Sequence, residues 1–232
     1  MQVLEDVGFS ANGKYFAYTT TEDNGMSDLT CRTTTFINTV RNQWVGRPYQ
    51  ICKFDGGEFN SEWSRKMKRD AKRAKREIPR LTKKLRINFK NDGQRVVGRA
   101  PFRYWKASGS ASKEFAKKGE SLTFTSKWNN TRYRMRLSKK TVVSAKCDDM
   151  MLRDPPAVMS LRMRNLTSKK STALQVDRSI PISRGCPFHY RLQNVYTHRY
   201  GRGKVVVALM QYFSPSIEGP DERYLVVSGR MN

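Results

Sequence analysis

Most of the chain consists of short runs rich in β-branched and aromatic residues, separated by Gly, Pro, Asn and Ser. Several runs alternate apolar and polar residues, which is typical of a strand with one buried face. The predicted strands are residues 3–9, 14–19, 31–40, 48–54, 96–105, 122–128, 133–143, 158–166, 173–176, 188–200, 204–213 and 224–227. This succession predicts a mainly β protein, either an antiparallel sandwich or a partly closed barrel.

One long stretch, residues 61–86, follows the helical period instead, with apolar side chains three or four positions apart. The apolar stripe consists of Trp63, Met67, Ala71, Ala74, Ile78, Leu81 and Leu85. Cations fill the positions between them, and the candidate anion-binding ones are Arg65, Lys66, Arg69, Lys72, Arg73 and Arg76. The pattern predicts one long basic amphipathic helix that docks on a sheet. Pro79 lacks a backbone donor, so we expect a kink or a split there.

We expect a single domain over residues 1–232, because a chain of this length can bury one sizeable core. Its predicted parts are an N-terminal β-meander (1–58), the basic helix (60–86) and a β-rich remainder (87–232). The Asn12-Gly13 pair between two apolar runs predicts a tight hairpin at the start of the chain. The polar residues 20–28 are expected to form a loop.

The charge balance indicates an anionic partner. The chain has 45 Lys and Arg against 20 Asp and Glu, a formal net charge of +25, whereas solubility alone needs a net charge of only about 2 to 8. In two predicted strands, arginine alternates with apolar residues, so the arginines should project from the face opposite the core. These candidate anion-binding residues are Arg132, Arg134, Arg136, Arg162 and Arg164. An envelope component, an acidic glycan or a nucleic acid would each satisfy such a surface.

The sequence contains few groups suited to catalysis. There are two histidines, His189 and His198, and neither a nucleophile elbow nor a His-Glu-x-x-His pair occurs. We therefore expect a protein that is not an enzyme and needs no cofactor. Cys186 and His189 have a ligand-like spacing that could form a zinc site with Cys147 and His198, but the spacing is irregular, and we expect no metal. Near the C-terminus, a charged structural turn is predicted from Glu218, Gly219, Pro220, Asp221 and Arg223.

The four cysteines, Cys31, Cys52, Cys147 and Cys186, are an even number that suits two disulfides in an oxidising compartment. Three connectivities are open. Four buried free thiols are the alternative, and the sequence favours neither.

Two motifs near the ends of the chain resemble a bacterial family of predicted secreted proteins of unknown function. The first is GFSANGKYFAY at residues 8–18, and the second is EGPD-x-RYL at residues 218–225. The resemblance implies export to the periplasm or beyond, with no assigned activity. The chain has no apolar run long enough to span a membrane. Residues 1–5 lead directly into a predicted strand, so we expect a mature form whose signal peptide is absent from this sequence.

The resemblance and the charge together predict an exported, non-enzymatic protein that binds an anionic partner through a basic surface. The alternative hypothesis is an intracellular basic protein that binds nucleic acid, with arginines on phosphates and aromatic rings on bases.

Overall fold

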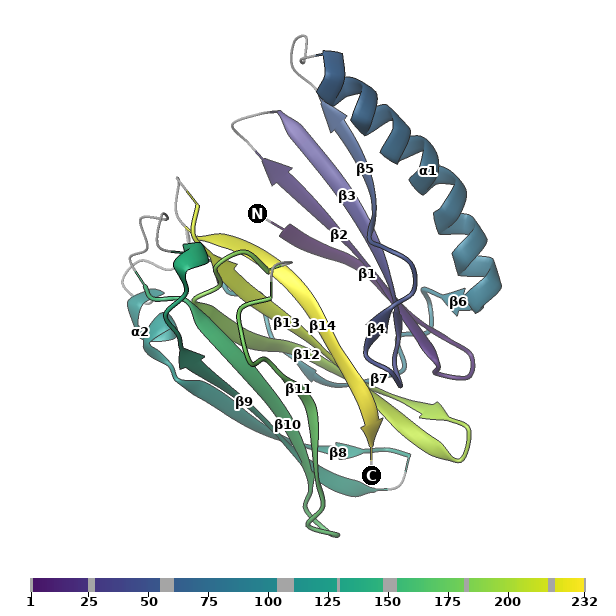
Figure 1. Ribbon diagram of the computed structural model, residues 1–232. Helices are drawn as coiled ribbons and strands as arrows, with labels where there is room; N and C mark the ends of the chain where they lie inside the picture. The colour runs from purple at the N-terminus through teal and green to yellow at the C-terminus, as the bar shows by residue number, and fades with distance from the viewer. Residues whose placement is uncertain are drawn as a thin grey trace. The chain divides into compact units, whose positions relative to one another are not determined.

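A computed structural model describes residues 2–24, 28–54, 61–103, 111–128, 130–147, 154–181, 184–216 and 220–231. The chain comprises two compact units. Unit 1 is Met1–Gly93 with His198–Val205, and unit 2 is Gln94–Thr197 with Val206–Asn232. The predicted fold class is confirmed: the protein is mainly β, with three antiparallel sheets and one long helix (Figure 1). None of the three sheets, as far as the described residues form them, closes into a barrel.

Unit 1 contains a six-stranded sheet in the order β4-β3-β2-β1-β6, with β5 also paired to β3. Its strands are β1 (Gln2–Ser10), β2 (Tyr15–Asn24), β3 (Leu29–Asn38), β4 (Gln43–Trp44), β5 (Tyr49–Phe54) and β6 (Ile87–Asn88). The predicted hairpin joins β1 to β2, where Gly13 has a φ of 70° and donates its N–H to the Ser10 carbonyl at 2.8 Å. A left-handed φ strains most residues but not glycine.

The loop expected at residues 20–28 is wrong over its first half. Strand β2 continues to Asn24, and residues 19–24 pair with residues 29–34 of β3. The threonines there are polar but β-branched, so they suit an extended backbone. The hydroxyls of Thr19 and Thr34 are also hydrogen-bonded at 3.1 Å. Residues 25–27 lie outside the described part of the chain.

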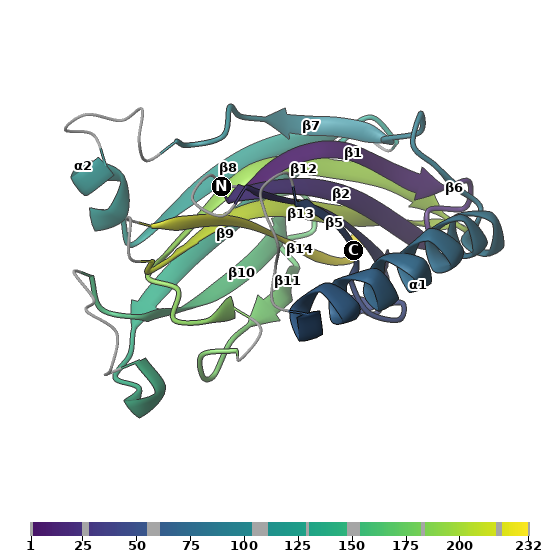
Figure 2. The ribbon, with the colours of Figure 1, turned by 90° about the horizontal axis from the view of Figure 1, so that it is seen from above.

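The predicted helix forms as α1 (Ser61–Leu85), of 25 residues. Figure 2 shows it along one side of the sheet that contains β1, β2 and β5. Its stripe packs as expected: Ala74, Leu81 and Leu85 are buried against Ala17, Phe36, Tyr49 and Ile87. Burial of this apolar surface holds the helix on the sheet. The side chain of Trp63 lies outside the described residues.

Pro79 does not split the helix, which runs unbroken from Ser61 to Leu85. Pro79 and Lys75 are both exposed. Proline cannot donate to the carbonyl four residues earlier, but here solvent can satisfy that carbonyl. The helix ends at Leu85. The next residue, Arg86, has a φ of 54° and donates its N–H to the Lys83 carbonyl at 3.1 Å, which closes the last turn.

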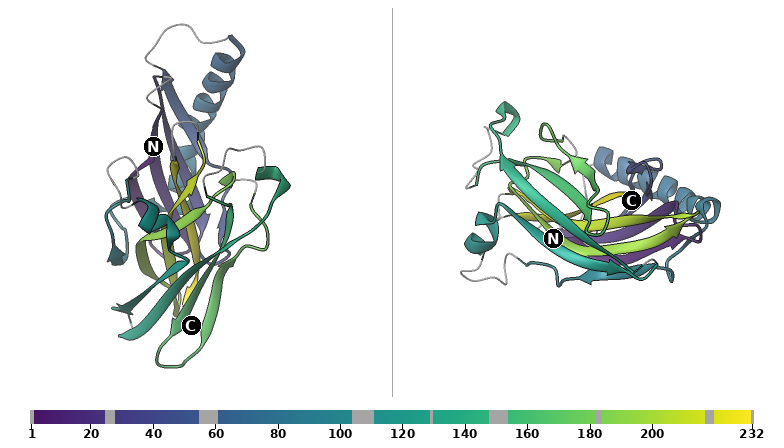
Figure 3. Two further views of the ribbon diagram at one scale, coloured as in Figure 1. Left: turned by 90° about the vertical axis from the view of Figure 1, so that its left-hand side faces the viewer. Right: turned by 90° about the horizontal axis from the view of Figure 1, so that it is seen from below.

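Two four-stranded sheets, in the orders β11-β10-β9-β8 and β14-β13-β12-β7, lie in unit 2 except for the end of β12 and the start of β13, which belong to unit 1. The first consists of β8 (Gly119–Ser126), β9 (Thr131–Thr141), β10 (Ala157–Asn165) and β11 (Ser171–Val176). The second consists of β7 (Gln94–Gly98), β12 (His189–Tyr200), β13 (Gly203–Ser214) and β14 (Asp221–Met231). Figure 3 gives two further views of these strands.

Both sheets of unit 2 contribute to one apolar core, which makes the unit a sandwich. Met135 and Leu161 from the first sheet and Leu192, Val206 and Met210 from the second are fully or almost fully buried in it. The sequence did not predict a short helix, α2 (Ala111–Ala116), or a 3-10 helix at Ala145–Cys147.

Candidate functional site

The arginines predicted to project from two strands lie together on the outer face of β9 and β10. Along β9 exposed and buried residues alternate, with Met135 and Leu137 inside, and β10 buries Leu161 and Met163 in the same way. The period of two therefore places every intervening arginine on the solvent side. We call this group the arginine lattice, and it consists of Arg132, Arg134, Arg136, Arg162 and Arg164.

The strand register sets like charges directly opposite each other. Arg136 pairs with Arg162, and Arg134 pairs with Arg164, in the antiparallel β9–β10 ladder. Directly opposed like charges on neighbouring strands are destabilising, by up to about 1 kcal/mol for each pair. These two opposed arginine pairs therefore lower the stability of the sheet.

The residues paired with these arginines on strands β8 and β11 include no Asp or Glu. Ladder partners on the outer strands are small: Ser121, Thr123 and Thr125 of β8, and Ser171 and Ala173 of β11. Within the described ranges, no lattice arginine makes an ion pair or a side-chain hydrogen bond. Each planar guanidinium can donate two parallel hydrogen bonds to a carboxylate or phosphate, so the lattice is suited to an anionic ligand.

The six predicted cations of α1 are all exposed. At about 100° per residue they occupy roughly a third of the helix circumference, opposite the buried stripe. Unlike the arginine lattice, this surface also contains acidic residues. Arg76 pairs with Glu77 at 3.1 Å, and Asp70 pairs with Arg47 at 3.0 Å. Hydrogen bonds from Arg80 and then Arg76 hold the pKa of Glu77 below its usual value. The helical cations belong to unit 1 and the arginine lattice to unit 2.

The cysteines form two disulfides, Cys31–Cys52 and Cys147–Cys186, with S–S distances of 2.06 and 2.12 Å. This selects one of the three connectivities and replaces the alternative of four free thiols. It also removes the zinc site considered from the sequence, because neither Cys147 nor Cys186 retains a thiolate to bind a metal. Across the described ranges, no group of three or more His, Cys, Asp or Glu residues could hold a metal ion.

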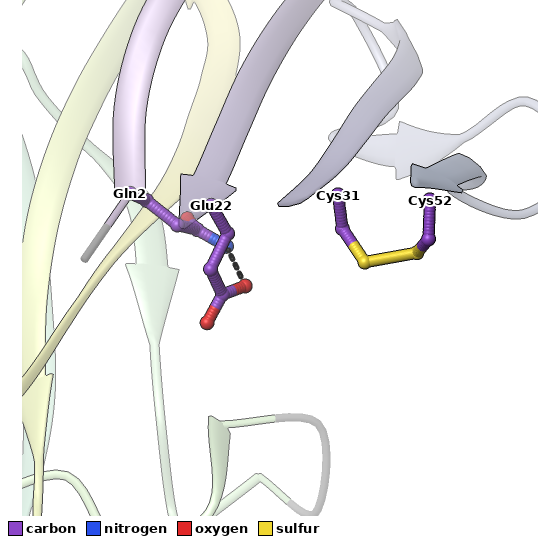
Figure 4. Close-up of a disulfide and its surroundings, with 4 residues drawn as sticks. All are labelled: Gln2, Glu22, Cys31 and Cys52. Atoms are coloured by element: carbon purple, nitrogen blue, oxygen red, sulfur yellow. Dashed lines mark hydrogen bonds between the residues drawn. A yellow bond between two sulfur atoms is a disulfide. The ribbon is translucent and has the colours of Figure 1, made fainter. Parts of the chain in front are cut away.

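The first disulfide belongs to a row of residues that crosses four strands. Gln2 pairs with Glu22, Glu22 with Cys31, and Cys31 with Cys52 in successive antiparallel ladders. Figure 4 shows this row, with Gln2 donating from Nε2 to the Glu22 carboxylate at 3.2 Å. The disulfide therefore joins two strands whose backbones already hold its cysteines side by side.

A cavity of about 290 Å³ lies beside this disulfide in unit 1. The sheet contributes five lining residues and α1 contributes three. They are Glu22, Leu29, Cys31, Gln50, Cys52, Lys66, Met67 and Asp70.

A polar cluster around the buried His189 in unit 2 was not predicted from the sequence. His189, 2% exposed, has Nε2 at 3.3 Å from Oε1 of Glu114 and Nδ1 at 3.2 Å from Nζ of Lys139. The ammonium can only donate, so Nδ1 accepts and Nε2 carries the proton. These residues are far apart in the sequence. The only sequence feature that pointed to the cluster was the scarcity of histidine, because His189 is one of two.

Burial and charge shift the titration of this cluster. Burial lowers the pKa of His189 and outweighs the Glu114 hydrogen bond, while the Lys139 charge lowers it further. The hydrogen bond from His189, with help from Lys117, lowers the pKa of Glu114 to about 2. Burial also lowers the pKa of Lys139. The arrangement keeps a neutral imidazole between an ammonium and a carboxylate.

The predicted C-terminal turn is described in part. Arg223 donates from Nη2 to the Asp221 carboxylate at 3.0 Å, next to Pro220. Glu218 and Gly219 lie outside the described residues.

None of the curated proteins compared matches this chain. Among the described helices, none has the length and apolar character needed to cross a membrane. The sequence profile of a family described as predicted secreted protein (DUF2259) matches residues 39–230, which include the EGPD-x-RYL motif but not the N-terminal one. The two disulfides fit the extracytoplasmic location of this family. The chain thus belongs to a family of predicted secreted proteins of unknown function, as its motifs indicated.

Proposed function

We propose that this exported protein binds an anionic partner through the arginine lattice and catalyses no reaction. The exposed cations of α1 serve as a second contact surface in the proposal. An acidic glycan or another anionic polymer of the cell envelope is the partner class, because such polymers occur where the protein is exported.

The observation that carries the proposal is the direct opposition of Arg134 to Arg164 and of Arg136 to Arg162. Ordinary surfaces mix charges of both signs, and a like-charged pair across a ladder reduces sheet stability. An anion bound between the opposed guanidinium groups would turn that repulsion into two sets of charge-assisted hydrogen bonds. The surplus of 25 positive charges would also raise the local concentration of any polyanion.

Two other functions have less support. Glu114, Lys139 and the buried His189 satisfy one another, and the 2% exposure of His189 leaves its imidazole little surface for contact with a substrate. An intracellular role in nucleic-acid binding fits neither the secreted family nor two disulfides.

The proposal is tested by binding to heparin, a soluble acidic glycan, at a series of salt concentrations. Replacing Arg134, Arg136, Arg162 and Arg164 by Gln should weaken binding by about tenfold or more, because each exposed ionic contact contributes a few tenths to 1 kcal/mol. Binding by the natural protein should weaken steeply as salt rises.

A matched control removes four exposed cations elsewhere. The control positions are Lys53, Lys90, Arg178 and Arg202, each changed to Gln. The control loses the same net charge, so it should bind nearly as well as the natural protein if the lattice is the site. Equal weakening of both variants would mean that only total charge matters. Tighter binding to duplex DNA than to heparin, measured at the same salt concentration, would instead support the nucleic-acid alternative.

A further inference from the structure

We infer that the Cys31–Cys52 disulfide is a site of thiol–disulfide exchange with a low-molecular-weight thiol, which enters the adjoining cavity. This inference is independent of the anion-binding proposal. It rests on where the two disulfides lie and on what surrounds the first of them.

The two disulfides differ in access. Cys31 and Cys52 line the 290 Å³ cavity, and Cys52 is half-buried. Cys31 is 8% exposed, so Cys52 is the accessible partner of this disulfide. By contrast, both cysteines of the other disulfide are buried, with Cys147 1% and Cys186 5% exposed. Exchange requires a thiolate to reach a sulfur atom, so access decides which disulfide reacts in the folded protein.

The size of the cavity selects the reactant. Ligand pockets usually measure about 300 to 1,000 Å³, so this one is at the lower limit and admits a small molecule rather than a protein loop. Its lining offers polar contacts from Gln50 and Glu22 and an apolar contact from Met67. A small thiol with polar groups fits this lining.

The charged residues around the cavity nearly balance. Asp70 is paired with Arg47 at 3.0 Å, and Glu22 accepts a hydrogen bond from Gln2. Lys66 also lines the cavity, and its positive charge offsets the Glu22 carboxylate, so a thiolate can approach the disulfide without a net repulsion.

The exchange proceeds in two balanced steps. The thiolate attacks Sγ of Cys52 and forms a mixed disulfide, while Sγ of Cys31 leaves with the electron pair and takes up a proton. A second thiolate attacks the small-molecule sulfur of the mixed disulfide and releases Cys52 as a thiolate. Two small thiols are thereby oxidised to their disulfide, and the protein disulfide gains two electrons.

The fold makes the exchange reversible. Six consecutive residue pairs, 29–34 of β3 with 49–54 of β5, hold the two strands in register through backbone hydrogen bonds. Opening the disulfide leaves this ladder in place, so the two thiols remain opposite each other and can be reoxidised.

The test uses the folded, oxidised protein and reduced glutathione at about pH 8, where part of the thiol is ionised. Samples are quenched in acid, free thiols are alkylated under denaturing conditions, and peptide mass mapping locates glutathione and alkyl groups. Cys31 and Cys52 should react about tenfold or more faster than Cys147 and Cys186, which serve as the internal control. Equal rates at both disulfides, or reaction only after denaturation, would overturn the inference.

Two variants narrow the cavity. Met67→Trp adds bulk from the helix and Gln50→Trp adds bulk from an exposed strand position; each should slow exchange at Cys31–Cys52 and leave the other disulfide unaffected. Lys75→Trp is the matched control, because Lys75 is exposed on the same helix but does not line the cavity. If Met67→Trp fails to fold, the exchange rate of Gln50→Trp tests whether the thiol enters through the cavity. Unchanged exchange in a folded cavity-narrowing variant would show that the cavity is not the route.

Discussion

The ammonium of Lys139 lies 3.2 Å from Nδ1 of His189, so a buried imidazole is held next to a positive charge. Arg191 adds a second cation, with Nε 3.8 Å from the Glu114 carboxylate that accepts from His189. Lys117 also pairs with Glu114. Protonating His189 would place a fourth positive charge among these groups and break the hydrogen bond that its Nδ1 accepts from Lys139.

The first prediction concerns acid stability. The folded pKa of His189 is below the unfolded value, so the stability it contributes is present above about pH 6.5 and is lost as the pH falls below that value. Glu114 is ionised in the folded protein down to about pH 2, so its contribution is lost between about pH 4.5 and pH 2. Urea unfolding should therefore show stability falling in both ranges.

The His189→Gln variant provides the control for the upper range. Its amide can retain both hydrogen bonds but cannot be protonated in this range, so the decrease between about pH 7 and pH 5 should become smaller. If the variant shows the same decrease in stability as the natural protein, the decrease comes from groups other than His189. The decrease below pH 4.5 should remain.

The second prediction compares the two disulfides. Cross-linking restricts the unfolded chain more when the closed loop is longer. The sequence separations are 21 for Cys31–Cys52 and 39 for Cys147–Cys186. Replacing the pairs by serine should lower the free energy of unfolding by about 3 and about 4 kcal/mol, respectively. Urea unfolding of both double variants measures this difference, and a larger loss from the shorter loop would contradict the chain-entropy account.

The third prediction concerns Gly13. Its φ is 70°, and a Cβ there would overlap the backbone carbonyl oxygen of Arg199 and lie 2.7 Å from Nδ1 of His198. Gly13→Ala should therefore cost about 3 kcal/mol or more, from backbone strain and steric overlap together. Thermal unfolding of the purified variant is the measurement.

Gly201→Ala is the matched control for Gly13. Gly201 has a φ of 55° but no atom within 4 Å of its hypothetical Cβ, so only the backbone term of about 1 to 2 kcal/mol applies. Equal losses in the two variants would show that the close approach of Arg199 to Gly13 has no energetic role.

The fourth prediction concerns Pro79. Proline in a helix interior is about 3 kcal/mol less favourable than alanine, and exposure at Pro79 reduces this penalty because solvent reaches the released carbonyl. Pro79→Ala should raise the free energy of unfolding by about 1 to 3 kcal/mol. Lys75→Ala, one turn earlier and also exposed, should change it little. A loss of stability in Pro79→Ala would mean that the proline ring contributes more to packing than its missing hydrogen bond costs.

Local periodicity predicted the parts of the structure that depend on near neighbours. The outward arginines of β9 and β10, the buried stripe of α1 and the Asn12-Gly13 turn all follow from spacing along the chain. Such features need only the geometry of one strand, helix or turn.

Features that depend on long-range contacts were not predictable in this way. The disulfide pairing follows from the β3–β5 register, and the opposition of Arg136 to Arg162 follows from the β9–β10 register. Glu114 reaches His189 across 75 positions of sequence, from a helix of six residues that composition does not mark. Tertiary pairing also extended β2 into residues expected to form a loop.

Because like charges oppose each other in the arginine lattice, the stability of this sheet should respond to added salt in the opposite direction from that of a surface ion pair. Surface ion pairs lose strength when electrolyte is added, but repulsion between Arg134 and Arg164 is relieved by it. In the proposed function, a multivalent anion bound across these side chains would bind only the native state and so shift the folding equilibrium toward it. Anion binding at this surface would therefore be thermodynamically linked to the stability of the sheet beneath it.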